Sequence, residues 1–351
     1  MKFFITVVAS VFGAISSLLI VLPLSAAANE AVGVRQITAH STERNSDLSV
    51  TVWYPSMGGG KPVMLGESPF FVGTPALLDA PASKHRYPLI LLSHGAGIAG
   101  SAQAVSWIAG PLAARGFIVA APTHPGNGGT SRSAAETMKL WLRPKDITET
   151  LNTLNKDEFF KDNIQSKEVG MLGLSMGGNT ALAIAGARID PAMLAHYCDD
   201  NTRNASLCDW VTRSGVDLHA MDMTLAGRDN RDDRIKFVMA IDPAPMDIFA
   251  SRSFATISLS VHLVNLGKLS EIPQTVRADK AAQSMPNASY ATIEDASHYS
   301  MFADCKPGIA GSSAEKEVGD PICSDGDGRS RKEIHDQMID MANAAFTQAL
   351  K

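Results

Sequence analysis

The sequence predicts an α/β fold, with a mostly parallel central sheet, helices on both faces and one cap-like insertion. The main observation is that short apolar runs alternate with segments in which apolar residues recur at helical spacing. This alternation is typical of parallel sheets covered on both faces by helices. The chain has 351 residues, 45% of them hydrophobic, so it can bury a large core. We see no internal repeat, and no linker divides the chain after its N-terminal segment. We therefore expect one domain over residues 29–351.

The expected strands are apolar runs bounded by turn residues. Two of them, separated by a polar turn, lie within 32–56. The second ("LSVTVWYP") shows the residue alternation of a strand and is rich in β-branched and aromatic residues. Residues 57–86 hold many Gly, Pro and Ser, which predicts a long loop. The other expected strands are 87–95, 117–126, 168–175, 235–245, 256–267 and 288–295.

The expected helices follow these strands and have helical spacing of their apolar residues. The segment that begins at Arg143 carries Pro144, which is tolerated in the first turn of a helix. The last segment is amphipathic and closes the chain. The expected helices are 101–116, 143–156, 179–189, 275–285 and 331–351.

The N-terminus has the layout of a secretory signal peptide. Lys2 is followed by a long apolar stretch, then by Pro23 and the small residues Ala26 to Ala28. An uncleaved anchor is the alternative, because the apolar stretch is long, but Pro23 and the A-x-A pattern favour cleavage after about Ala28. We expect residues 1–28 to be a signal peptide, the mature protein to be periplasmic or secreted, and no membrane span to remain.

The expected export determines how the four cysteines are interpreted. An even number in an oxidising compartment indicates disulfides, and four cysteines allow three pairings. We expect the two local ones, Cys198 with Cys208 and Cys305 with Cys323. A zinc site is the weaker interpretation, because the C-x-x-C spacing is absent.

The charge pattern argues against a nucleic-acid partner. The formal net charge is −5, and phosphate binding needs clustered Lys and Arg. The one dense basic patch, from Arg329 to Lys332, opens the last expected helix and is interpreted as a solvated helix start. The sequence does not indicate an oligomeric state.

Ser175 is the candidate nucleophile. Residues 173–177 read Gly-Leu-Ser-Met-Gly, which fits G-x-S-x-G between an apolar strand and an Ala-rich helix. A serine on such a sharp turn has a strained backbone, and side chains two positions away would collide, hence Gly173 and Gly177. The simpler alternative is that the glycines only form the turn.

His298 is the candidate base among the nine histidines. In this arrangement the chain order is Ser, acid, His, with the His on a loop after the last strand. His262 lies inside an apolar strand and is expected to be packed in the core. His335 lies in the last helix and is expected on its solvated face, and His219 belongs to the candidate cap.

Asp242 is the favoured acid, because it ends the run "FVMAID" at the edge where the serine turn is expected. It would hold the imidazole tautomer and stabilise the imidazolium. Glu271, after the next strand, is the alternative. The oxyanion hole would use the backbone N–H groups of Met176 and, within "SHGAG", of Ala96, with His94 ordering that loop.

These residues together resemble a known group. "VTVWYP", "LILLSHGAG", "LAARGFIVAAPTHPGN", "RPKDI", "GLSMGG", "AIDPAP" and "ASHYSMF" occur in the order seen in α/β-hydrolases. The chain is most similar to bacterial dienelactone-hydrolase-like proteins and platelet-activating-factor acetylhydrolases. The resemblance implies the α/β-hydrolase fold and supports Asp242 over Glu271, and Ala96 with Met176 as oxyanion donors. It is also consistent with a Cys305–Cys323 bridge.

The activity that the resemblance implies is hydrolysis of a small-molecule or lipid-like carboxylic ester. It would proceed through a Ser-His-Asp triad and an acyl-enzyme, with no metal or organic cofactor. The alternatives are a serine peptidase or amidase, and a non-catalytic binding protein with the same fold. Dienelactone hydrolases use a Cys nucleophile, so Ser175 does not imply their substrate.

The polar, irregular connection 188–234 matches no segment of the similar family residue by residue. It contains Cys198, Cys208 and Trp210, and long connections in compact domains are usually functional or disordered. We expect a cap over the active site. A surface elaboration held by a disulfide is the alternative.

Overall fold

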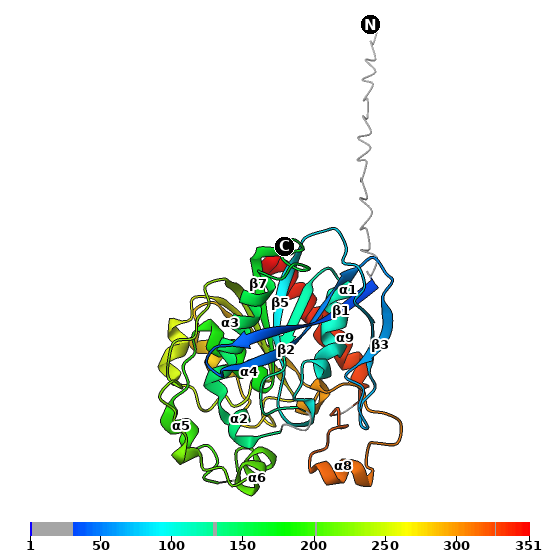
Figure 1. The fold of residues 1–351 in the computed structure, drawn as a ribbon. Coiled ribbons are helices and arrows are strands. Elements are labelled where there is room, and N and C mark those ends of the chain that lie inside the picture. The colour runs from blue at the N-terminus through cyan, green and yellow to red at the C-terminus, as the bar shows by residue number, and fades with distance from the viewer. Residues whose placement is uncertain (2–30, 129–131, 201, 327) are drawn as a thin grey trace.

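A computed structural model describes residues 1, 31–128, 132–200, 202–326 and 328–351. Apart from Met1, the predicted signal peptide lies outside these residues. Within them, ten strands form one sheet in the order β10-β9-β8-β7-β5-β6-β2-β1-β4-β3 (Figure 1). All neighbours from β10 across to β6 are parallel, whereas β2 is antiparallel to both β6 and β1. The expected mostly parallel sheet is confirmed.

The strands begin and end close to where the sequence predicts them. Their apolar side chains are buried on both faces in the centre of the sheet, as in β5, where every residue is buried. The bounds are β1 Ala31–Ser41, β2 Ser46–Ser56, β3 Lys61–Leu65, β4 Thr74–Leu78, β5 Tyr87–Ser93, β6 Ile118–Pro122, β7 Ile164–Leu174, β8 Ile235–Ile241, β9 Ser260–Leu266 and β10 Ala288–Ile293.

The loop predicted over 57–86 is wrong in part, because it contains β3 and β4. These two short strands pair with each other, and β4 adds to β1 at the far edge of the sheet. Pro62 lies in the edge strand β3, where proline is tolerated, and Pro75 lies in β4 before its short pairing with β1, which involves Leu77 and Leu78. The Gly and Pro content therefore hid two short strands at this end of the sheet.

Helices cover both faces of the sheet. Helices α1 (Ser106–Ala114) and α9 (Arg331–Leu350) pack on one face, with Ile108 and Phe346 in its apolar core. Helices α3 (Arg143–Leu154) and α4 (Met176–Ala185) pack on the other, with Ile147 and Leu182. The remaining short helices are α2 Ala134–Met138, α7 Asp279–Ser284 and α8 Ser313–Val318.

The connection 188–234 holds short helical pieces: α5 (Pro191–Ala195), α6 (Ala205–Arg213) and the 3₁₀ turn η5 (Leu218–Ala220). It is tied to the domain where Ile189 bridges Phe249. Helix α6 contacts α2, and both lie with α5 at the lower left in Figure 1. The insertion thus packs on the domain rather than extending away from it.

Both local disulfides are present, Cys198–Cys208 inside the insertion and Cys305–Cys323 near the C-terminus. The second bridge lies beside the sheet edge, because Phe71 and Cys305 form an isolated β-bridge. Among the described helices, none is both long enough and apolar enough to cross a membrane.

Candidate active site

Ser175 lies on the turn between β7 and α4. Its backbone has φ 53° and ψ −120°, a conformation that costs a non-glycine residue about 1–3 kcal/mol. The turn is held by backbone hydrogen bonds: the Ser175 N–H donates to the Ile241 carbonyl at 3.0 Å, and the Ser175 carbonyl accepts from Gly178 at 2.8 Å. The strain therefore persists because strand β8 holds the Ser175 N–H and the first turn of α4 holds its carbonyl.

The glycines around Ser175 are required by close backbone contacts. A Cβ at Gly177 would lie 1.8 Å from the carbonyl oxygen of Ser93, and one at Gly173 would lie 2.1 Å from the Gly177 carbonyl. The predicted collision at both positions is confirmed. Gly178, which the sequence reasoning missed, is needed as well, because its Cβ would lie 2.7 Å from Cα of Pro243.

His298 lies beside Ser175, as expected. It is the first residue of the 3₁₀ turn η7 (His298–Met301), and its Nε2 lies 3.1 Å from Ser175 Oγ. The start of η7 is fixed by a capping box between Ser297 and Ser300. The side chain is 31% exposed, so the imidazole borders solvent while its position is set by the turn.

Asp242, and not Glu271, contacts this imidazole. Its Oδ2 lies 2.7 Å from Nδ1 of His298, and its side chain is 1% exposed. With Nδ1–H donating to the carboxylate, the Nε2 lone pair is free to accept the Ser175 hydroxyl proton. Glu271 is exposed and pairs with Lys268 instead.

Asn265 is a supporting residue that the sequence reasoning missed. It is fully buried in β9, and its amide donates to Asp242 Oδ1 at 2.8 Å and to the Val276 carbonyl at 2.8 Å. Asp242 Oδ1 also accepts from the Leu266 N–H at 2.9 Å. Both carboxylate oxygens are thereby engaged. A polar residue inside the apolar run "VHLVNLG" was the available signal.

The loop after β5 approaches Ser175 closely. A Cβ at Gly95 would lie 3.3 Å from Cβ of Ser175. Within the described residues, no hydrogen bond engages the backbone N–H of Ala96 or of Met176. Both donors are thus available, and Met176 opens α4, where the helix dipole favours negative charge.

A buried polar network supports this loop from behind. His94 donates from Nδ1 to the Gly95 carbonyl at 2.7 Å, and its Nε2 accepts from the His124 N–H at 3.0 Å. Arg143, the first residue of α3, donates to the His94 carbonyl. Burial lowers the pKa of His94 well below its usual value, so its ring is neutral at pH 7 and can act as both donor and acceptor. The role expected for His94, ordering the loop, fits these contacts.

Asp146 completes the network on the α3 side. It is fully buried and accepts from His124 Nδ1 at 2.8 Å and from Arg44 Nε at 2.9 Å. Burial raises the pKa of this carboxyl, and Arg44 opposes that effect. Arg143 and Asp146, both in the run "RPKDI", therefore support the loop beside Ser175. Arg143 contacts the loop directly, and Asp146 acts through His124.

His335 is not on a solvated face, and that expectation is wrong. It is 5% exposed, its ring stacks on Trp107 with centroids 3.8 Å apart, and its Nε2 donates to the carbonyls of Ser300 and Phe302. His335 therefore gives a hydrogen-bond donor from α9 to carbonyl oxygens in and directly after η7. His262 is partly buried in β9, where Nδ1 bonds Ser289 Oγ at 2.6 Å.

Comparisons with known proteins agree with this geometry. A ferulic acid esterase from Streptomyces cinnamoneus has a similar fold, with a TM-score of 0.60, at 16% identity over 94% of this chain and 92% of that one. Residues 72–153 match the family described as platelet-activating factor acetylhydrolase, isoform II. The chain has the α/β-hydrolase fold. The family match covers less than half of the chain, namely residues 72–153.

A dienelactone hydrolase from Anabaena variabilis aligns at 12% identity with a TM-score of 0.48, over 90% of this chain and 97% of that chain. No curated protein matches the chain in sequence.

Gly177→Ala tests the contact between the two turns. The added Cβ meets backbone that cannot move without displacing Ser175, and a misplacement of this kind can lower kcat about 100-fold. Hydrolysis of a p-nitrophenyl ester and the melting temperature are measured together. Gly110→Ala in α1 is the control, because its Cβ would lie 3.4 Å from Thr74 Cγ2, an ordinary contact. Wild-type kcat in Gly177→Ala would contradict the close contact.

The buried state of His335 predicts a pH effect on stability. Burial lowers its pKa to about 4, so the native ring stays neutral while the unfolded one, with pKa near 6.5, takes up a proton as the pH falls. The wild type should therefore lose roughly 2–3 kcal/mol between about pH 6.5 and pH 4 that His335→Gln does not lose. Melting curves over this range measure the difference, with exposed His85→Gln as the control. Parallel curves for the wild type and His335→Gln would contradict the buried, neutral ring.

Proposed function

We propose that the chain is an exported serine carboxylic-ester hydrolase in which Ser175, His298 and Asp242 form the catalytic triad. The observation that carries the proposal is the continuous hydrogen-bonded chain from Ser175 Oγ to His298 Nε2, at 3.1 Å, and from His298 Nδ1 to Asp242 Oδ2, at 2.7 Å. Nucleophile, base and orienting acid within hydrogen-bond reach are what activation of a serine requires.

In the acylation step Ser175 Oγ attacks the ester carbonyl carbon, and its proton passes to His298 Nε2. The resulting imidazolium is stabilised by the buried Asp242 carboxylate. The backbone N–H groups of Met176 and Ala96 are the proposed donors to the developing oxyanion, and each such donor can be worth about 10²–10³ in kcat.

The tetrahedral intermediate collapses when His298 gives the proton to the leaving alcohol oxygen, which leaves an acyl group on Ser175. Water then attacks the acyl carbonyl while His298 Nε2 takes a proton from it. The second tetrahedral intermediate breaks its bond to Ser175 Oγ, which takes that proton back from His298, and the acid product departs. The chemistry uses no metal and no organic cofactor.

The proposed location and substrate rest on other features of the chain. The two disulfides are of the kind that persists in an oxidising compartment, which supports a periplasmic or secreted protein. The substrate is proposed to be a small-molecule or lipid-like ester. The insertion 188–234 is proposed to act as a cap, since α6 packs on α2 and the guanidinium of Arg132 lies 5.1 Å from the ring centroid of Trp210.

Ser175→Ala is the test of the triad. Loss of the nucleophile is expected to lower turnover of a short p-nitrophenyl ester by at least about 10⁴-fold. The variant should keep the wild-type circular dichroism spectrum, because alanine can take the same backbone conformation at the same cost. Retention of most turnover by a folded Ser175→Ala protein would refute the proposal.

The assay also separates the ester hydrolase from a peptidase on the same scaffold. A p-nitrophenyl ester and the matched p-nitroanilide carry the same acyl group and differ in the bond that breaks. The proposal expects turnover of the ester and little of the anilide, and preferred cleavage of the anilide would identify a peptidase or amidase instead.

A further inference from the structure

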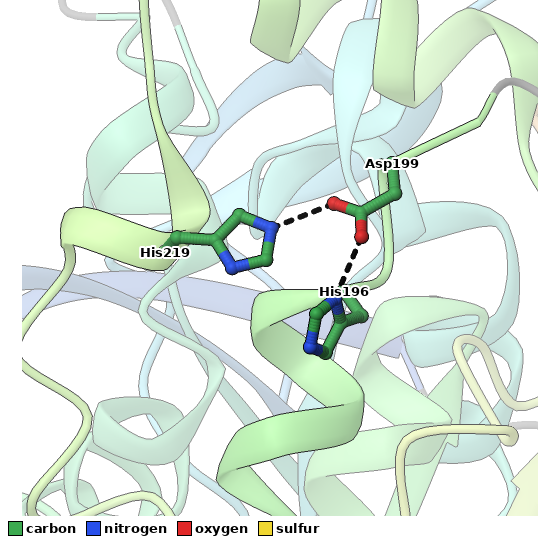
Figure 2. Close-up of side chains that lie close together, drawn as sticks. All are labelled: His196, Asp199 and His219. Atoms are coloured by element: carbon green, nitrogen blue, oxygen red, sulfur yellow. Dashed lines mark hydrogen bonds and ion pairs between the residues drawn. The ribbon is translucent and has the colours of Figure 1, made fainter.

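A second cluster of chemically active side chains lies in the insertion, outside the triad. His196, Asp199 and His219 are all exposed, and one ligand atom from each lies within 4.8 Å of the others. Figure 2 shows the Asp199 carboxylate between the two imidazole rings. The ester hydrolysis proposed above uses none of these residues.

The two imidazole nitrogens and the carboxylate oxygens point toward one another. His196 Nδ1 lies 2.6 Å from Asp199 Oδ2, and His219 Nε2 lies 2.7 Å from Asp199 Oδ1 (Figure 2). The two rings meet edge to face with centroids 4.6 Å apart. Within the described residues, neither outer ring nitrogen makes a hydrogen bond, so the inward nitrogens are the engaged ones.

Each of the three residues is also held locally. His196 ends α5, where its N–H donates to the Ala192 carbonyl at 3.1 Å. His219 lies in η5, whose first turn is capped by Asp217 through a 2.9 Å bond from the His219 N–H. Cys198, next to Asp199 in sequence, is fixed by its bridge to Cys208. The backbone therefore brings the three side chains together independently of their mutual contacts.

The cluster presents one carboxylate and two imidazole nitrogens toward a common centre, where a positive charge would be attracted by the carboxylate. Exposed ion pairs contribute little to stability, because solvent screens them. A divalent cation would supply the same positive charge and bind all three groups at once.

We propose that His196, Asp199 and His219 bind one divalent transition-metal ion of the Zn²⁺ class. Two imidazoles and a carboxylate are ligands that Zn²⁺ takes, with one position left for water. The ion would link the end of α5 to η5, across 20 residues between Asp199 and His219, and so stabilise the insertion.

The change of geometry needed for binding is small. Ligand atoms of a tetrahedral zinc site lie about 3.3 Å apart, given metal–ligand bonds of about 2.0–2.1 Å. The two nitrogen–oxygen distances must therefore open by less than about 1 Å from their present hydrogen-bonded values. The two imidazole nitrogens, which now lie within 4.8 Å of each other, must approach by at most about 1.5 Å, and exposed side chains can make both adjustments by rotation. Binding replaces the protons that now lie between nitrogen and oxygen, so these protons are released to solvent.

The test is a titration of the full chain, free of any histidine tag and stripped of metal with EDTA, with ZnCl₂ by isothermal calorimetry. The wild type should bind one Zn²⁺, and His219→Gln should bind it at least about tenfold more weakly, as should His196→Gln. His40→Gln is the matched control, because His40 forms an exposed pair with Asp47, at 2.9 Å, without a third ligand. It should bind zinc as the wild type does.

Limited proteolysis gives a second readout that does not depend on ester hydrolysis. Zn²⁺ should slow cleavage within 188–234 in the wild type and in His40→Gln, but not in His219→Gln. Equal zinc affinity of the wild type and both cluster variants, or no binding by the wild type, would overturn the proposal. Because none of these residues belongs to the triad, either result leaves the proposed ester hydrolysis to be judged separately.

Discussion

The close contact between two backbone turns, one after β5 and one after β7, determines the geometry of the whole active site. A side chain at Gly177 would have to occupy the space of the Ser93 carbonyl oxygen, 1.8 Å from its Cβ. The two turns are therefore fixed against each other, and the loop that carries Ala96 lies beside the serine. The positive φ of Ser175 follows from the same contact, because the chain must leave β7 and enter α4 within a single residue. The strain at the serine is offset by hydrogen bonds to β8 and to the first turn of α4.

The proposed triad depends equally on contacts that hold Asp242 and His298 from behind. Asn265 and a backbone N–H engage one oxygen of Asp242, which leaves the other for His298. The turn that carries His298 is held by α9, through His335, and by α1, through Trp107, whose indole N–H donates to the Met301 carbonyl at 3.0 Å. The position of the imidazole thus depends on helices on the opposite face from α4. Loosening of the C-terminal helix is expected to reach the active site by this route.

The sequence predicted the sheet, the helices and the three residues that lie hydrogen-bonded at the proposed triad, because each has a local pattern. The Gly-Leu-Ser-Met-Gly turn lies between an apolar strand and an Ala-rich helix, and Asp242 ends an apolar strand. Residues whose environment comes from distant segments were missed or misread. His335 was predicted on the solvated face of its helix, but the carbonyl oxygens of Ser300 and Phe302 that accept from it lie 35 and 33 residues earlier in the chain. Asn265 donates to the carboxylate of Asp242, which follows the neighbouring strand β8, and β4 pairs in parallel with β1, from which β2 and β3 separate it in the chain. Neither the role of Asn265 nor strand β4 could therefore be recognised from its own segment.

The central claim is that Ser175 is a nucleophile activated by His298, and labelling with a fluorophosphonate tests it most directly. The reagent phosphonylates an activated serine hydroxyl and expels fluoride, which leaves a stable adduct visible by intact-mass spectrometry. The account predicts one adduct per chain, located in the peptide that contains residue 175, and much slower labelling of His298→Ala. A folded wild-type protein that stays unlabelled at residue 175 would contradict it.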